Sequence, residues 1–166
     1  MEMAKQEMEV TRGQLYAIRL RHMTMPTTAV MRRWRDARLA NYNAAIREYW
    51  AIAKDIAEVT ASPNIYGHDA GRLLLNASDI PLSQQRHFIM ASRNLDDAFI
   101  DAVIAYNDVS IGMHDIVSLT HLRLIATVSD RQVRRKLFTD IRKNKLSVAD
   151  VKAWLKERSE AQKEAA

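Results

Sequence analysis

Between Ile80 and Leu95 the sequence contains no Asp or Glu, and its polar side chains are amides, hydroxyls, guanidinium groups and one imidazole. At the start of a helix such groups can contact base edges in the major groove of DNA, where glutamine pairs with adenine and arginine with guanine. The pattern predicts that bases are contacted by Ser83, Gln84, Gln85, Arg86, His87 and Arg93. His87 has an equally good alternative position as a hydrogen-bonded histidine in the core.

A second set of residues has the chemistry to hold phosphate groups. From Arg131 to Lys145 there are seven Lys and Arg residues and one Asp. Further upstream, a helix that starts after Ser118 would present backbone N–H groups and small donors in its first turn. We therefore predict phosphate contacts by Thr120, His121, Arg123, Arg131, Arg134, Arg135, Arg142, Lys143 and Lys145. The alternative interpretation of the cationic run is a solvated helix face.

Another arginine cluster surrounds Trp34 and consists of Arg32, Arg33, Arg35 and Arg38. It is a second candidate for contact with the phosphate backbone. The alternative is a solvated helix face with Trp34 in the core.

No residue pattern in the chain predicts catalysis. The five histidines show neither H-x-H nor H-E-x-x-H spacing, and there is no cysteine, so no metal site is expected. There is no Gly-rich phosphate loop and no nucleophile motif. We expect a protein that is not an enzyme, with no catalytic residue, no metal and no cofactor.

The charge is unevenly distributed along the 166 residues, whose formal net charge is +5. Residues 1–60 carry 10 Lys and Arg against 7 Asp and Glu, residues 61–126 carry 4 against 7, and residues 127–166 carry 11 against 6. Two basic regions therefore flank an acidic middle. Its acids Asp96, Asp97, Asp101, Asp108 and Asp115 are expected to lie away from DNA or to face a basic partner.

Composition and periodicity predict an all-α fold. The chain has only 4 Gly and 3 Pro, too few for a many-stranded sheet protein, and hydrophobic residues recur at helical spacing. No apolar run is long enough for a membrane span, the N-terminus does not resemble a signal peptide, and cysteine is absent. These features predict a cytoplasmic protein without membrane contact.

The helices expected from caps and breakers divide the chain into three parts. We predict an N-terminal helical arm over residues 1–26, a helical DNA-binding domain over residues 27–160 and a frayed tail over residues 161–166. In the long helix from about Thr28 to Thr60, apolar residues step by 4, 3, 4 and 3, which is one face of a helix. This seam is expected in the protein's own core, with a dimer contact as the alternative; it consists of Tyr42, Ile46, Tyr49, Ala53 and Ile56.

Two short helices in the middle of the chain form the pattern of a helix-turn-helix over about residues 68–93. The first, from about His68 to Leu75, is expected to bury Ala70, Leu73 and Leu74. The second, Gln84 to Arg93, would be capped by Ser83, and Asn76 could take a left-handed conformation in the turn. A longer helix follows with Leu95, Phe99, Ala102 and Tyr106 on one face, and three more begin at Ser118, Asp130 and Ser147.

Three stretches resemble ParB-like partition proteins and KorB-like repressors. Ser118-Leu119-Thr120-His121-Leu122-Arg123 is similar to the S-x-x-H-x-R that follows the helix-turn-helix in that family. Val128 to Arg131 matches its linking turn, and Lys145 to Val151 resembles the opening of its next helix. The nucleotide-binding box of ParB proteins has no counterpart here, so clamp sliding is not implied.

The N-terminal half resembles the DNA-binding domain of YhcG-type nucleases. Residues Asn43 through Ile56, followed by Tyr66-Gly67, are similar to the "N…YW.IG..I…YG" pattern of that group, and the likeness covers about Arg32 to Leu155. The nuclease domain of that group has no counterpart in the sequence.

Both resemblances imply binding of double-stranded DNA through a helix-turn-helix with a supporting helical subdomain. We expect a bacterial, nucleoid- or plasmid-associated transcriptional regulator or a segregation-type adaptor, acting as a homodimer because one small module contacts few base pairs. A ParA-type ATPase is a candidate protein partner. The alternative function is a helical protein-interaction or dimerisation module without DNA contact, and RNA binding is a weaker third.

Overall fold

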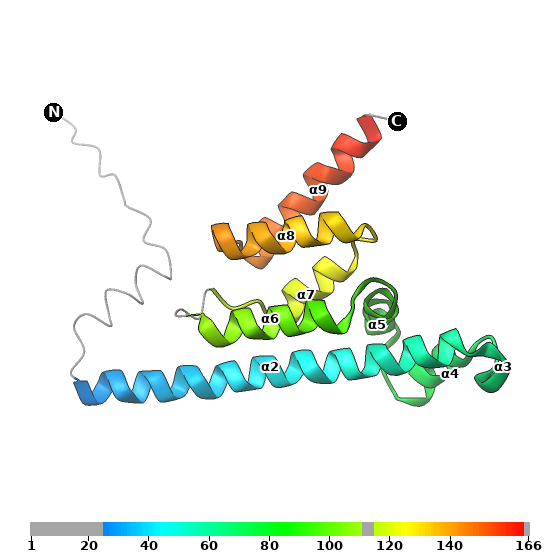
Figure 1. The fold of residues 1–166 in the computed structure, drawn as a ribbon, viewed down its shortest axis with the longest axis horizontal. Helices are drawn as coiled ribbons and strands as arrows, with labels where there is room; N and C mark the ends of the chain where they lie inside the picture. The colour runs from blue at the N-terminus through cyan, green and yellow to red at the C-terminus, as the bar shows by residue number, and fades with distance from the viewer. Residues whose placement is uncertain (1–24, 111–114, 165–166) are drawn as a thin grey trace. The chain divides into compact units, whose positions relative to one another are not determined.

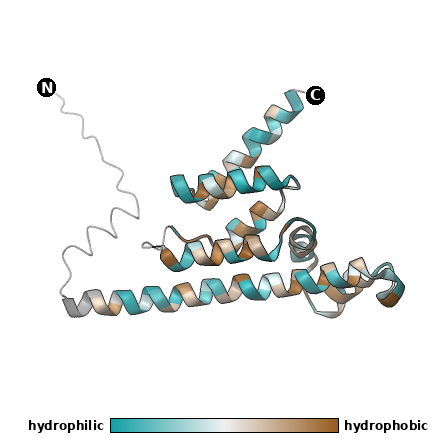
Figure 2. Ribbon diagram, in the orientation of Figure 1, coloured by the Kyte–Doolittle hydropathy of each residue, from teal (hydrophilic) through white to brown (hydrophobic). Residues whose placement is uncertain are grey.

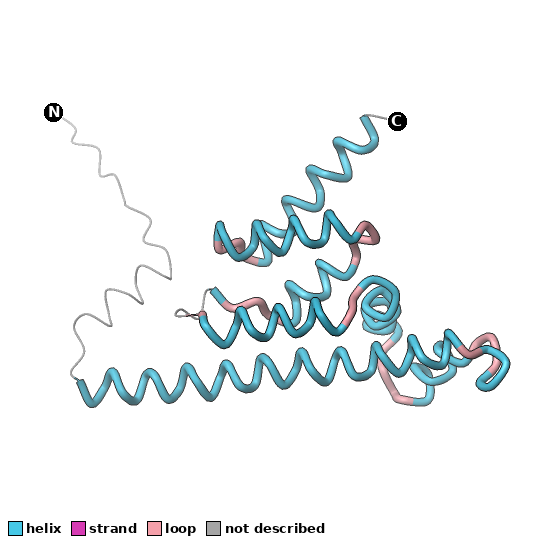
Figure 3. Tube along the Cα trace, in the orientation of Figure 1, coloured by secondary structure: helices cyan, strands magenta, loops and turns pink. Residues whose placement is uncertain are grey.

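The computed structural model describes residues 25–110 and 115–164, and these residues form helices and loops without a strand (Figure 3). The fold is therefore all-α, as the sequence predicts. Its elements are α2 (Met25–Ala61), α3 (Pro63–Tyr66), α4 (Ala70–Ala77), α5 (Leu82–Asn94), α6 (Asp97–Val109), α7 (Leu119–Ala126), α8 (Arg131–Asn144) and α9 (Val148–Glu164). The predicted helical segment Glu2 to His22 lies outside the described residues.

The chain separates into two units, Met1–Arg38 and Leu39–Ala166, and α2 continues through the boundary. In the described part of the first unit, Trp34 is 64% exposed, so the alternative that placed this ring in the core is wrong. The predicted domain boundaries at residues 26 and 160 stay predictions. All contacts described below lie within the second unit.

The apolar seam of α2 packs into the protein's own core. Ile46, Tyr49, Ala53 and Ile56 are at most 3% exposed, and only Tyr42 at the start of the seam is half-buried. The Tyr49 hydroxyl donates a hydrogen bond of 2.6 Å to the backbone carbonyl of His87 on α5. Since the seam is filled by other helices of the same chain, it is not available as a dimer contact.

Helix α6 runs beside α2 in the opposite direction and beside α8 in the same direction (Figure 1). Acidic side chains of α6 make the connections to α2. Asp108 accepts a hydrogen bond of 2.8 Å from the Asn43 amide, and Asp97 accepts bonds from Trp50 Nε1 and Lys54 Nζ at 2.6 and 3.1 Å. Asp97 and Asp108 thus hold α6 to α2.

The same acidic segment also connects to α8. Asp96 forms an ion pair of 3.5 Å with Arg131, and Asp115 forms one of 3.8 Å with Lys145. Lys145 also donates to the Tyr106 hydroxyl at 3.0 Å. Figure 2 shows that α6, which is enclosed in this way, is more hydrophobic than α9.

Asn107 holds the end of α6 from inside the core, where it is fully buried. Its amide group donates to Asn43 Oδ1 and to the Val117 carbonyl, both at 3.0 Å, and its oxygen accepts from the Val117 N–H at 2.8 Å. All its hydrogen-bonding groups therefore have partners, which is the condition for a stable buried amide.

The predicted caps of the last three helices are confirmed. Ser118 caps α7, Asp130 accepts from two backbone N–H groups at the start of α8, and Ser147 forms a reciprocal pair with Asp150 before α9. The cap predicted at Ser83 is wrong, because α5 begins at Leu82, two residues earlier than predicted, and follows Pro81 without a side-chain cap. Ser83 is therefore an exposed residue in the first turn.

Two predicted helix faces are rotated in the structure. In α4 the buried side chain is Leu75, while Leu73 and Leu74 are 59% and 38% exposed. Gly71 explains the rotation: a Cβ there would lie 2.8 Å from Thr60 Oγ1, so the glycine face of α4 is the one pressed against α2. The buried face of α6 consists of Ile100, Val103, Ile104 and Asn107. It is shifted by one residue toward the C-terminus from the predicted face that contains Phe99, Ala102 and Tyr106.

Candidate nucleic-acid interface

Helix α5 has one buried and one exposed face, as its pattern predicts. Phe88 and Ala91 are buried, and Leu95 just after the helix is buried with them. Arg86 and Arg93 are exposed on the opposite side, seven residues and therefore two turns apart. No acidic residue lies anywhere in α5.

The turn before α5 is closed by a side chain that was predicted to contact bases. Gln85 is 8% exposed, and its amide donates to Asn76 Oδ1 at 3.1 Å and to the Ile80 carbonyl at 2.9 Å. Its assignment to a DNA base is wrong, because both bonds hold the α4–α5 turn. The left-handed position of that turn is Asp79, at φ 54°, and not Asn76.

The remaining predicted base-contacting residues stay accessible. Ser83, Gln84, Arg86 and Arg93 are exposed, although Gln84 lies outside the Arg86–Arg93 face by helical geometry. His87 is half-buried, which leaves both of its predicted roles open. Burial lowers the pKa of His87, and the nearby Arg123 and Arg86 guanidinium groups lower it further, so the ring is neutral near pH 7.

Arg123 of α7 thus lies close to α5 and makes this region more positive. Its guanidinium group stands 5.7 Å from the centre of the Tyr49 ring, and its Nε is buried without a hydrogen-bond partner. Neither Arg86 nor Arg123 forms an ion pair with a carboxylate of the described residues. We call Ser83, Arg86, His87, Arg93 and Arg123 the α5–α7 surface. Thr120, on the same helix as Arg123, is exposed.

His121 was predicted to contact phosphate, and this assignment is wrong. The side chain is 8% exposed, and its Nδ1 accepts from the Ser118 backbone N–H at 3.2 Å in a capping box. Since Nδ1 is the acceptor, Nε2 carries the proton and donates to the Leu146 carbonyl at 3.1 Å. Desolvation lowers the pKa of His121, which favours this neutral form.

Arg134 is a second phosphate prediction that the structure corrects. It is 8% exposed, and its Nη1 donates to the carbonyls of Val128 and Ser129 at 2.7 and 2.6 Å. The guanidinium group therefore holds the turn between α7 and α8. Both Nη1 hydrogens are used in this way, and the low exposure of the side chain leaves little of the guanidinium group accessible to a phosphate.

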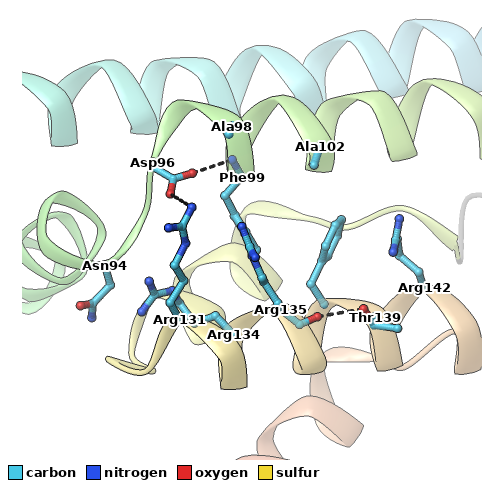
Figure 4. A pocket seen from close by; sticks show the side chains of 11 residues that line it. Asn94, Asp96, Ala98, Phe99, Ala102, Arg131, Arg134, Arg135, Thr139 and Arg142 are labelled. Carbon is cyan, nitrogen blue, oxygen red and sulfur yellow. Dashed lines mark hydrogen bonds and ion pairs between the residues drawn. The ribbon is translucent and has the colours of Figure 1, made fainter.

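The other predicted phosphate residues of α8 are exposed. Arg135, Arg142 and Lys143 form no ion pair with a described carboxylate, whereas Arg131 and Lys145 have Asp96 and Asp115 as partners. Figure 4 shows Arg131, Arg135 and Arg142 extending from α8 toward α6. The three positions, at spacings of 4 and 7, form one face of the helix.

These three arginines line a groove that the sequence prediction missed. The groove has a volume of about 360 Å³, and its apolar lining is Ala98, Phe99, Ala102 and Phe138. Its two walls come from segments 29 residues apart in the sequence, which a helical wheel does not connect. The sequence did contain one signal of this groove, a helical spacing that places three arginines and an aromatic residue on one face: Arg131, Arg135, Phe138 and Arg142.

In the part of the chain described here, no helix is long and apolar enough to cross a membrane, and no three acidic or histidine side chains group together as metal ligands would. Comparison with known proteins identifies no relative: no family model, no curated protein and no solved structure matches the chain.

Proposed function

We propose that the protein binds double-stranded DNA in a sequence-specific manner, with the exposed face of α5 in the major groove. The observation that carries the proposal is the α5–α7 surface: Arg86 and Arg123 both lie near His87, and Arg93 is two turns along α5 from Arg86. None of the three arginines has a carboxylate partner among the described residues. Lys54, Arg72 and Arg131, by contrast, are each paired with an acid, while the other unpaired cations of the second unit include Arg135, Arg142 and Lys143 on α8. Cations left unpaired at one place are suited to a polyanion.

The geometry of α4 and α5 supports the same proposal. The two helices are joined by a four-residue turn, and Gln85 fixes that turn from the buried side. This arrangement is typical of a helix-turn-helix, in which the first turns of the second helix contact bases. The phosphate contacts of this proposal are Thr120 and Arg123, with Lys143 as a further exposed cation. The resemblance to ParB-like and YhcG-type DNA-binding domains gives additional support.

The test is a fluorescence anisotropy titration of the full chain with fragments selected from a genomic pool, at two salt concentrations. Arg86→Ala should weaken binding to the selected fragment by about 1–3 kcal/mol and relax its specificity, because a bidentate contact with guanine is lost. Lys156→Ala is the matched control, because it removes one exposed cation of α9 that pairs with Glu160. It should leave affinity and specificity unchanged.

Two outcomes would contradict the proposal. One is that no duplex binds at low salt, where non-specific attraction to DNA is strongest. The other is that Arg86→Ala and Lys156→Ala have equal effects, which would mean that α5 supplies only general charge. Within the proposal, the protein acts as a transcriptional regulator or a segregation-type adaptor of a bacterial, phage or plasmid system, with a ParA-type ATPase as a candidate partner.

Exposed apolar residues favour a second candidate function, protein interaction, and we propose them as the contact of a homodimer. Ile65 is 76% exposed and Leu73 is 59% exposed, and both lie in the short helices α3 and α4. Exposed apolar groups of this kind are typical of interfaces. Sedimentation equilibrium should show a dimer that Leu73→Ser weakens. A monomer at all concentrations would contradict this second proposal and leave DNA binding untouched.

A further inference from the structure

The groove between α6 and α8 combines positive charge with an apolar lining. Four arginines line it, Arg131, Arg134, Arg135 and Arg142, against the single carboxylate of Asp96. That carboxylate is already engaged, because it pairs with Arg131 and accepts the N–H of Phe99 at 2.8 Å (Figure 4). The groove therefore carries an excess of three positive charges from its lining residues.

The apolar part of the groove indicates what kind of ligand fits. Ala98 and Ala102 stand one turn apart on α6, are exposed, and leave room beside Phe99. A large apolar side chain of a partner would fill this space and release the water from it. The phosphodiester backbone of DNA has no such group, so DNA would leave the space unfilled.

The aromatic rings of the groove are not free to stack on a nucleotide base. The rings of Phe99 and Phe138 pack on each other at 5.2 Å between centroids, and Phe138 is only 5% exposed. The guanidinium group of Arg142 lies 4.8 Å from the centre of the Phe138 ring. What the groove offers is therefore a shallow apolar space with arginines beside it.

We infer that the groove binds an acidic amphipathic segment of a partner protein, through one large apolar side chain and at least two carboxylates. Arg135 and Arg142 pair with the carboxylates, because both are exposed and have no acidic partner among the described residues. They are seven residues apart on α8, which is about 10 Å along the axis. Guanidinium groups form bidentate bonds with carboxylates, which fixes the orientation of the two groups relative to each other. The inference does not depend on DNA binding.

The first experiment is a display selection of random 16-residue peptides on the immobilised full chain, followed by titration of the enriched peptides. The expected sequences contain two or more acids and a large apolar residue. Arg135→Glu and Arg142→Glu should each weaken their binding about tenfold or more, because a charge-assisted pair becomes a repulsion. Lys156→Glu makes the same charge change on α9 and should have no effect.

A second measurement locates the bound peptide. The chain contains no cysteine, so Ala102→Cys introduces a single thiol in the groove. Bound peptide should slow thiol labelling at this position. The matched control is Ala105→Cys, which is also exposed on α6 but does not line the groove, and its labelling rate should not change.

Three results would overturn the inference. The selection could enrich no acidic-apolar sequence, the peptides could bind Arg135→Glu as well as the unchanged chain, or both thiols could be protected equally. A fourth result would assign the groove to DNA: Arg135→Glu would then weaken binding of the selected duplex as strongly as Arg86→Ala does.

Discussion

Two regions of the second unit are rich in exposed arginine, and they differ in what surrounds the charge. On the α5–α7 surface, Arg86 and Arg93 lie on the outer face of a helix, and the residues beneath them are already packed in the core. In the α6–α8 groove, Arg135 and Arg142 stand beside an apolar space. Positive charge alone would suggest one partner for both regions. The apolar lining is what separates a phosphate backbone from a protein segment as the ligand.

The difference between the two regions follows from which cations are neutralised by acids of the same chain. Acids of the middle segment neutralise cations that bind α2 and α8 to α6, for example Lys54 and Arg131. Arginines that remain unpaired include Arg86 and Arg93 on the outer face of α5, and Arg135 and Arg142 beside the alanines of α6. An overall charge of +5 therefore says less about partners than the positions of the unpaired cations.

The largest expected effect in the groove concerns stability and not binding. Arg134→Ala should lower the free energy of unfolding by about 1.5–3 kcal/mol, because the carbonyls of Val128 and Ser129 lose a charged donor whose side chain is buried. Arg135→Ala, its exposed neighbour, should change stability by less than about 0.5 kcal/mol. Urea unfolding of both variants measures this. Equal losses of unfolding free energy in the two variants would mean that Arg134 does not stabilise the turn between α7 and α8.

Helix positions and caps were largely predictable, because they depend on local signals. The seam from Ile46 to Ile56 repeats at helical spacing over two turns and more, so its buried face could be identified from the sequence alone. Ser118, Asp130 and Ser147 are each followed by a periodic apolar pattern and were correctly assigned as caps. The eight residues of α4 are too few for a periodic signal, and its buried face depends on the contact of Gly71 with α2.

Site residues were less predictable, because their roles depend on groups far away in sequence. His121 looks accessible in the first turn of a helix, but its Nε2 meets the carbonyl of Leu146, 25 residues later. Gln85 has a side chain of the type that contacts bases, but its partner is Asn76 of the preceding helix. The groove is likewise assembled by packing, since Phe99 and Phe138 come from different helices. What the sequence did indicate is the acid-free outer face of α5.

A smaller expected effect, the pH dependence of the unfolding free energy, should also distinguish the two regions. His121 supports α7, which carries Arg123, whereas no histidine lines the groove. The pKa of His121 is lowered in the folded state, mainly by desolvation, so the unfolded state binds more protons. Its contribution to stability is complete above about pH 6.5, the ordinary histidine value, and is lost as the pH falls from there toward the lowered folded value.

The measurement is urea unfolding between pH 5 and 7.5. His121→Gln should flatten the loss of stability at acid pH, because glutamine can keep the capping box with Ser118 and does not titrate. Some pH dependence of the same sign should remain, since burial also lowers the pKa of His87. His68→Gln replaces an exposed histidine and is the control. If it flattens the profile as much as His121→Gln, the burial of His121 is not the origin of the effect.

The smallest expected effect is the sharpest test of the comparison. Removing one phosphate contact lowers the salt slope of DNA binding by about one unit. Arg123→Met, which keeps the apolar stem beside Tyr49, should show this decrease. Arg135→Met should show none, although it removes the same charge from a more exposed site on α8. Equal decreases for the two variants would mean that one continuous DNA surface includes the groove, and an unchanged slope for Arg123→Met would remove α7 from the DNA interface.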